Sequence, residues 1–112
     1  MATSTFYLCY GFKVNGPSLP AKDRELLMSG IDDFKLMPTD TFGSYESPWY
    51  FGLWMTTQYE EEDAVFIDPI DMVSIQSDVD LNRKLMNYAH DLCKVSADLL
   101  PTWRVVRVTK RN

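Results

Sequence analysis

The chain has 112 residues, 46% of them hydrophobic, and its 16 acidic and 11 basic side chains give a net charge of −5. A chain of this size buries about two-thirds of the surface that it exposes when unfolded, which predicts one globular domain over residues 1–112 and excludes intrinsic disorder. No stretch approaches the roughly 20 apolar residues of a membrane-spanning helix and no secretory signal is visible, so we expect a cytoplasmic protein without membrane contact.

The charge changes sign along the chain. Residues 1–39 are neutral overall, residues 40–82 contain ten acidic residues and no Lys or Arg, and residues 83–112 have an excess of five positive charges. The ten acidic residues are Asp40, Glu46, Glu60, Glu61, Glu62, Asp63, Asp68, Asp71, Asp78 and Asp80. We therefore expect a strongly dipolar molecule.

The first elements are a strand and a short helix. Residues 5–14 carry apolar side chains on both faces of a strand, which is typical of a central position in a sheet. A turn at residues 15–17 follows, and Ser18 is the expected N-cap of a helix that ends at residue 28 or 29. Gly30 stands where a helix C-cap is expected.

Two further strands are predicted in the middle of the chain. The alternation over residues 34–37 indicates a strand that Pro38 ends, and a proline at this margin favours an edge strand. Residues 39–48 have the composition of a loop. The run from Trp49 to Thr57 is the most apolar of the chain and has aromatic residues on both faces, so it predicts a second central strand.

The segment 58–77 has two interpretations. Four consecutive acidic residues precede two short apolar stretches, 64–67 and 72–75, so the segment is either an acidic loop or an extra hairpin. The next helix is expected over residues 79–99, because Ser77 or Asp78 caps it and apolar residues recur at helical spacing until Pro101. The alternation over residues 102–109 predicts the last strand.

This order of elements predicts an α+β ferredoxin-like split βαβ sandwich, an antiparallel sheet with two helices on one face. The first and third strands are the central pair of that topology, as their apolar character on both faces requires. Since two helices cover only one face, the other face needs a cover. A homodimer built on Tyr7, Tyr50 and Trp54 or on the edge of the final strand would provide it, or else the segment 58–77 folding back.

The aromatic residues of the central strands suggest a comparison with the RNA recognition motif, in which bases stack on such side chains. The stacking candidates are Tyr7, Tyr50 and Trp54, and the accompanying basic residues are Arg104, Arg107, Lys110 and Arg111. The strand over residues 49–57 lacks that family's basic signature, however, and the net negative charge opposes approach to phosphates. Nucleic-acid or nucleotide binding on the aromatic sheet face is therefore the first alternative function.

Signatures of catalysis are missing from the sequence. It contains no phosphate loop, nucleophile elbow or dinucleotide fingerprint, and His90 is its single histidine. His90 and Cys93 share a face of the expected helix, but no further metal ligands follow at a recognisable spacing. Cys9 and Cys93 lie inside apolar patterns, as reduced, buried thiols do. We predict no catalytic residue, metal or cofactor, with a small enzyme that uses His90 and Cys93 as the second alternative.

Acidic residues interleaved with aromatic side chains are typical of a protein interface, in which the charges steer association and the aromatic groups anchor it. The sequence therefore favours a small binding or regulatory module that occupies a basic, nucleic-acid-binding surface of a partner protein. In this general character it is similar to some virus-encoded inhibitors of host nucleases. The alternative is that the acidic stretch is an exposed, solvated segment without a binding role. The residues expected to contact the partner are Glu60, Glu61, Glu62, Asp63, Asp68, Asp71, Tyr45, Tyr50, Trp54 and Tyr59.

Overall fold

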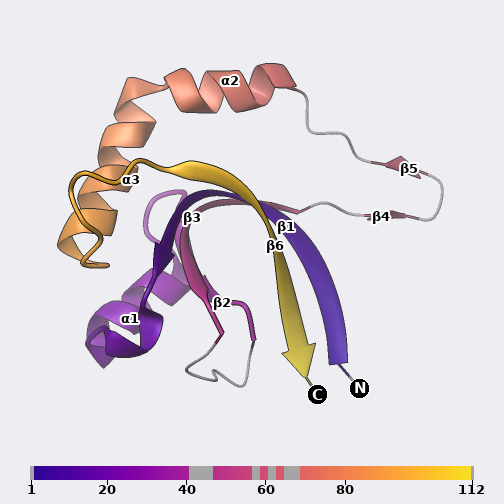
Figure 1. Cartoon of the computed structure of the whole chain (residues 1–112), viewed down its shortest axis with the longest axis horizontal. Coiled ribbons are helices and arrows are strands. Elements are labelled where there is room, and N and C mark those ends of the chain that lie inside the picture. Colours follow the sequence, from indigo (N-terminus) through magenta and orange to yellow (C-terminus); the bar gives the residue numbers. More distant parts are fainter. Residues whose placement is uncertain (1, 41–46, 57–58, 61–62, 65–68, 112) are drawn as a thin grey trace.

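A computed structural model describes residues 2–40, 47–56, 59–60, 63–64 and 69–111 of the chain (Figure 1). It confirms the α+β class, with a four-stranded antiparallel sheet and three helices. The elements in chain order are β1 (Ala2–Val14), a 3₁₀ turn (Gly16–Ser18), α1 (Ala21–Ser29), β2 (Lys35–Pro38), β3 (Trp49–Thr56), β4 (Tyr59–Glu60), β5 (Asp63–Ala64), α2 (Pro69–Ser77), α3 (Val79–Asp91) and β6 (Thr102–Arg111).

The four long strands form one sheet in the order β2-β3-β1-β6, and every neighbouring pair is antiparallel. The two strands that were predicted to be central, β1 and β3, are the inner pair. Their register brings Phe12 opposite Phe51 and Gly11 opposite Gly52. The first and last strands run along each other from Ala2↔Arg111 to Gly11↔Thr102, so the chain ends lie side by side (Figure 1).

The main core lies between one face of the sheet and the helices α1 and α3. Phe51 of β3, Leu27 of α1 and Leu85 of α3 are each fully buried in this core. The predicted contact of the long helix with the central strands is therefore confirmed, and α1 and α3 cover the same face. We call this side of the sheet the helix-covered face.

The other face is enclosed by the curvature of the sheet itself. Gly11 and Gly52 allow the two central strands to approach closely, because a Cβ atom on Gly52 would lie 2.2 Å from the carbonyl oxygen of Tyr10. Beyond β2 the chain reaches the opposite edge, where the Thr109 amide donates to the Thr39 carbonyl at 2.9 Å. We call this side the inner face.

The inner face has a core of its own. Cys9, Val106 and Val108 are buried in it, and Met37, Tyr50, Trp54 and Tyr7 pack around them. The curvature of the sheet and the Thr39–Thr109 contact already enclose these buried residues. They therefore need neither a second copy of the chain nor the segment 58–77 as a cover. The reason given above for a homodimer therefore does not hold for this face.

The long helix begins as predicted and ends earlier. Asp78 is its N-cap, since Oδ1 accepts the Leu81 amide at 3.0 Å. The expected end at residue 99 is wrong: α3 stops at Asp91, and Lys94 takes a left-handed φ of 59° so that the Val95 amide donates to the Ala89 carbonyl at 3.0 Å. The reversal buries Cys93 and Val95 but leaves Leu99 51% exposed.

The start of α1 also differs from the prediction, whereas its end agrees with it. Ser18 does not cap α1, which begins at Ala21 after Pro20; its hydroxyl donates to the Asn15 carbonyl at 2.8 Å within the 3₁₀ turn. Gly30 closes α1 as predicted, with a φ of 104° that favours glycine.

The segment 58–77 contains a hairpin and a helix. β4 and β5 pair with each other, Tyr59 opposite Ala64 and Glu60 opposite Asp63, so the hairpin lies around the acidic run and is not formed by the two apolar stretches. The second apolar stretch lies in α2, which was not predicted. Among the described residues no helix is both long and apolar enough to cross a membrane.

Candidate functional site

The predicted partner-binding acidic residues belong to a segment that is set apart from the main sheet. We call residues 57–78 the acidic arm. Within it β4 and β5 form a ladder only with each other, and Figure 1 shows this ribbon projecting from the side of the four-stranded sheet. Glu60 and Asp63 occupy directly opposed positions of the ribbon, and Asp71 is exposed in the first turn of α2. Tyr45, Glu61, Glu62 and Asp68 lie outside the described residues.

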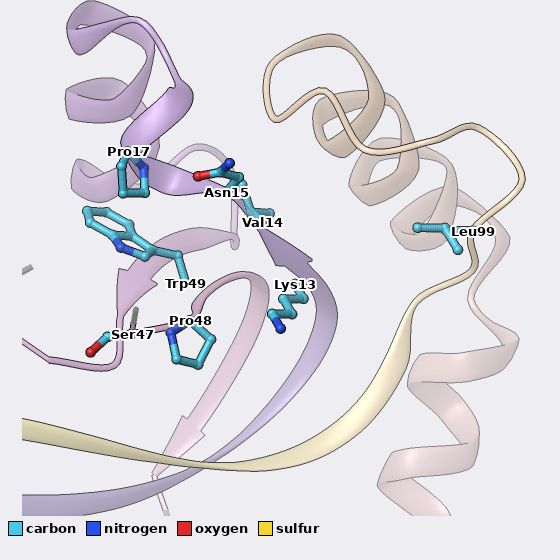
Figure 2. A pocket seen from close by; sticks show the side chains of 8 residues that line it. All are labelled: Lys13, Val14, Asn15, Pro17, Ser47, Pro48, Trp49 and Leu99. Atoms are coloured by element: carbon cyan, nitrogen blue, oxygen red, sulfur yellow. The ribbon is translucent and has the colours of Figure 1, made fainter. Parts of the chain in front are cut away.

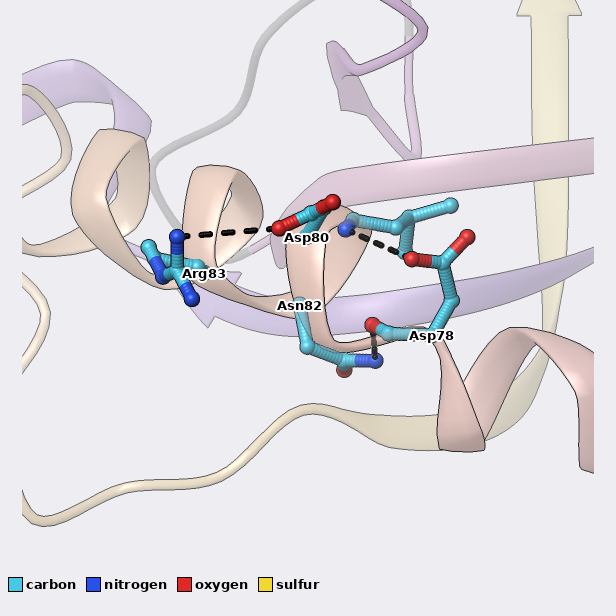
Figure 3. A network of polar contacts seen from close by, with 5 residues as sticks. Asp78, Asp80, Asn82 and Arg83 are labelled. Carbon is cyan, nitrogen blue, oxygen red and sulfur yellow. Dashed lines mark hydrogen bonds and ion pairs between the residues drawn. The ribbon is translucent and has the colours of Figure 1, made fainter.

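The junction of the acidic arm with α3 is held by polar contacts (Figure 3). Asn82 Nδ2 donates to the carbonyls of Asp78 at 2.7 Å and of Ile75 at 2.9 Å, so one amide ties the start of α3 to the end of α2. Asp80 forms an exposed ion pair with Arg83 at 3.6 Å. Asp78 and Asp80 are thus engaged in contacts of the fold, whereas Asp71 in the arm is exposed.

Three predicted aromatic residues come together on the inner face. The rings of Tyr7 and Trp54 meet edge to face with centroids 5.7 Å apart, and Trp54 Nε1 donates to the Lys35 carbonyl at 2.8 Å. The Arg104 guanidinium lies over the Tyr50 ring, 5.0 Å from its centroid. These rings are half-buried and pack on the small core around Cys9.

The four predicted basic residues do not form one patch. Arg104 lies on the inner face, where it also donates to the Thr102 hydroxyl at 2.7 Å. Arg107, at an odd position of the same strand, lies on the opposite face, is exposed, and donates from Nε to the Ser4 hydroxyl at 3.1 Å. Lys110 and Arg111 continue β6. The alternation of the strand therefore divides these charges between two surfaces.

His90 and Cys93 do not share a site. Cys93 is 4% exposed within the main core, and burial raises the pKa of its thiol to about 12, so little nucleophilic thiolate forms near neutral pH. His90 is exposed, and its Nδ1 lies 3.2 Å from the Val95 carbonyl oxygen. Among the residues that the structure describes, no three His, Cys, Asp or Glu side chains are close enough to hold a metal ion.

A groove that was not predicted lies at the end of β1 (Figure 2). It has a volume of about 590 Å³, and its walls come from three separate stretches of chain. The lining residues are Lys13, Val14, Asn15, Pro17, Ser47, Pro48, Trp49 and Leu99. Figure 2 shows the Trp49 ring beside Pro17 and the Lys13 amine close to Pro48. The described lining offers one ammonium, one amide and one hydroxyl on apolar walls, and no acid–base pair.

No sequence pattern could have located this groove, because its walls meet only after the β1–β3 pairing and the early end of α3. Comparison with known protein families, curated proteins and solved structures finds no match to this chain. The proposals below therefore rest on the geometry and charge of the chain alone.

Proposed function

We propose that this chain is a small acidic binding protein whose acidic arm occupies a basic surface of a partner protein, in the manner of an inhibitor that takes the place of nucleic acid. The observation that carries the proposal is that the β4–β5 ribbon pairs only with itself, so the most acidic stretch is presented outside the main sheet. Charges on such a projecting element steer association over a distance of about one Debye length, about 8 Å at physiological salt.

The composition of the arm supports the same function. Residues 57–78 contain seven acidic residues without a single Lys or Arg, so no basic side chain within the arm neutralises them. Aromatic side chains such as Tyr59 lie within the same stretch and would provide the apolar anchors that a charged interface needs. Two free, buried cysteines suit a protein that works in the reducing cytoplasm.

The acidic arm lies in the connection between β3 and α3. We propose that the domain is a ferredoxin-like split βαβ sandwich with the arm inserted between its third strand and its second helix. The sheet order β2-β3-β1-β6, with α1 after the first strand and α3 before the last, supports this arrangement.

The test is capture of partners from the native cell with the full chain as bait, with nuclease treatment and salt washes. A basic protein retained without nucleic acid, and released by salt, is expected. Its association rate should fall about tenfold or more when the arm carries E60K, E61K, E62K and D63K, because steering charges act on the on-rate. The matched control reverses four acidic residues outside the arm, with D23K, E25K, D33K and D91K, and should keep the binding. Equal loss in both variants would reject a specific role for the arm.

A second candidate function is nucleic-acid binding on the inner face. The observation that favours it is the Arg104 guanidinium over Tyr50, next to the Tyr7–Trp54 pair, which places a cation among three aromatic rings. Recovery of nucleic acid in the capture experiment, with a salt slope that R104A reduces by about one, would favour this function over the first.

A further inference from the structure

The outer edge of β6 is open over most of its length. Thr109 has its amide directed away from β1, since it donates to the Thr39 carbonyl of the chain beyond β2. The β1–β6 register is continuous, and backbone groups alternate in direction along a strand, so Trp103, Val105 and Arg107 also direct N–H and C=O groups outward. Among the described residues no strand pairs with the edge from Trp103 to Arg107.

The side chains at this edge are basic and apolar. β6 contains four basic residues and no acidic one. Val105 is 68% exposed at the centre of the open stretch, and Phe6 on the neighbouring strand is 45% exposed. An open strand edge of this kind binds another extended segment through main-chain hydrogen bonds, and the charge at the edge decides which segment.

Charge complementarity identifies the segment. Pairing of β6 with β6 of a second copy would bring the arginines of both strands together, and such like-charge juxtaposition is unfavourable. The acidic stretch Glu60–Asp63 has the opposite charge, and its flanking strands β4 and β5 are extended and pair only with each other. An edge of the acidic β4–β5 ribbon, placed beside Arg104 and Arg107, satisfies both the backbone groups and the charges.

We propose that the open edge of β6 binds the acidic arm of a second copy of this chain, in a reciprocal homodimer in which each arm lies along the partner's β6. This inference rests on the proposed function, because it takes the arm as the binding element and gives it one partner. Reciprocal exchange closes the assembly with two-fold symmetry, so a dimer and not a filament is expected.

The first test is a charge swap in the full chain, measured by analytical ultracentrifugation over a wide range of concentration. The unmodified chain is expected to dimerise reversibly and more weakly at high salt. R104E with R107E, or the arm variant with E60K, E61K, E62K and D63K, should each raise the dimer dissociation constant about tenfold or more. An equimolar mixture of the two variants should restore dimerisation, because both contacts of the mixed dimer then join opposite charges. K22E with R24E on α1 is the control of equal charge change and should leave the dimer unchanged.

The second test isolates the backbone of the edge. V105P removes an N–H that points away from β1, so the β1–β6 ladder keeps its bonds while the edge loses a donor. It should raise the dissociation constant about tenfold, whereas V105A, which shortens the same side chain and keeps the donor, should change it less than about threefold. Equal effects of the two substitutions would overturn strand addition at this edge.

The outcomes separate this inference from the proposed function. A chain that stays monomeric at every concentration, or that dimerises without regard to the β6 charges, overturns the homodimer. Capture of a basic protein that depends on the arm would then still support the proposed function. Dimerisation abolished by the arm and β6 variants and restored by their mixture, with no other protein captured, supports the homodimer and overturns a separate partner protein.

Discussion

The hydroxyl of Tyr10 in β1 donates a hydrogen bond of 2.6 Å to Oδ1 of Asn82 in α3. The amide of the same side chain donates to the carbonyls of Ile75 and Asp78. Asn82 therefore links the central strand of the sheet, the long helix and the end of α2 through one side chain. The position of the acidic arm relative to the sheet depends on this link, because α2 is the last element of the arm.

Removal of this link should destabilise the domain in a graded way. Tyr10→Phe loses one hydrogen bond and should lower the free energy of unfolding by about 1 kcal/mol. Asn82→Ala loses the same bond together with the side-chain bonds to the Ile75 and Asp78 carbonyls, and should cost about 1–3 kcal/mol. Urea unfolding measures both. Asn87→Ala, an exposed asparagine of the same helix, is the control, and an equal effect at the two asparagines would contradict the link.

The end of α3 can be tested with two leucines that share helical spacing in the sequence. Leu85 is fully buried and Leu99 is 51% exposed. Leu85→Ala should cost about 2–5 kcal/mol as a core truncation, and Leu99→Ala should stay within about 0.5 kcal/mol because the helix has ended before it. Chemical denaturation of both variants checks the pair. A large loss of stability in Leu99→Ala would contradict this end of α3 and support the longer helix that the spacing of the leucines predicts.

The two leucines also show which parts of the fold a local sequence pattern predicts and which it does not. Apolar residues on both faces of β1 and β3 correctly predicted their central position in the sheet, because a strand buried on both faces has no polar side. The same apolar spacing continued past Asp91, and no glycine announces the reversal at Lys94. Lys94 adopts its left-handed conformation where tertiary contacts bury Cys93 and Val95. Such contacts cannot be predicted from the spacing of apolar residues along the chain.

The misinterpretation of α2 has a different cause. Pro69 lies between the two apolar stretches, where a proline indicates a break, but proline is also favoured in the first turn of a helix because no amide hydrogen bond is lost there. Asp71 in the first turn was a second helix-start signal. Nothing local could show the Thr39–Thr109 contact that closes the inner face, since it joins residues far apart in the chain. For the same reason the groove at Lys13 and Trp49 could not be predicted.

The close approach of β1 and β3 depends on the pair Gly11 and Gly52. A Cβ atom at Gly11 would lie 2.0 Å from the Phe51 carbonyl oxygen, which is backbone and cannot rotate away. Gly11→Ala and Gly52→Ala should therefore each cost at least about 2 kcal/mol through forced separation of β1 and β3. Thermal unfolding measures the loss.

Gly30→Ala provides the comparison for that pair. Its Cβ would have ordinary contact at 3.6 Å, so only the strain of a positive φ remains. A smaller loss is expected than at Gly52. Near-parent stability of Gly52→Ala would show that the central strands do not need the close approach.

The two cysteines predict how stability changes at alkaline pH. Burial raises the pKa of the Cys9 thiol from its usual 9.0 to about 12, against the opposing effect of the Arg104 guanidinium, and burial raises the pKa of the Cys93 thiol to about 12 as well. Above pH 9.0 the thiols of the unfolded chain ionise while those of the folded chain stay neutral. Their contribution to stability is therefore complete below pH 9.0 and is lost as the pH rises toward 12.

Removal of both thiols should flatten this alkaline loss. In a variant with C9A and C93A, the free energy of unfolding is expected to fall less steeply between pH 9 and 12 than in the parent, even though the two truncations lower stability at neutral pH. The slope difference is the readout, because Tyr10, whose pKa burial also raises, contributes equally to both proteins. Alkylation by iodoacetamide, followed by mass spectrometry, gives an independent measure: both thiols should stay unmodified in the folded chain and react after denaturation. Rapid alkylation of Cys93 in the folded protein would mean that its thiol is accessible after all, and would reopen a catalytic role for it.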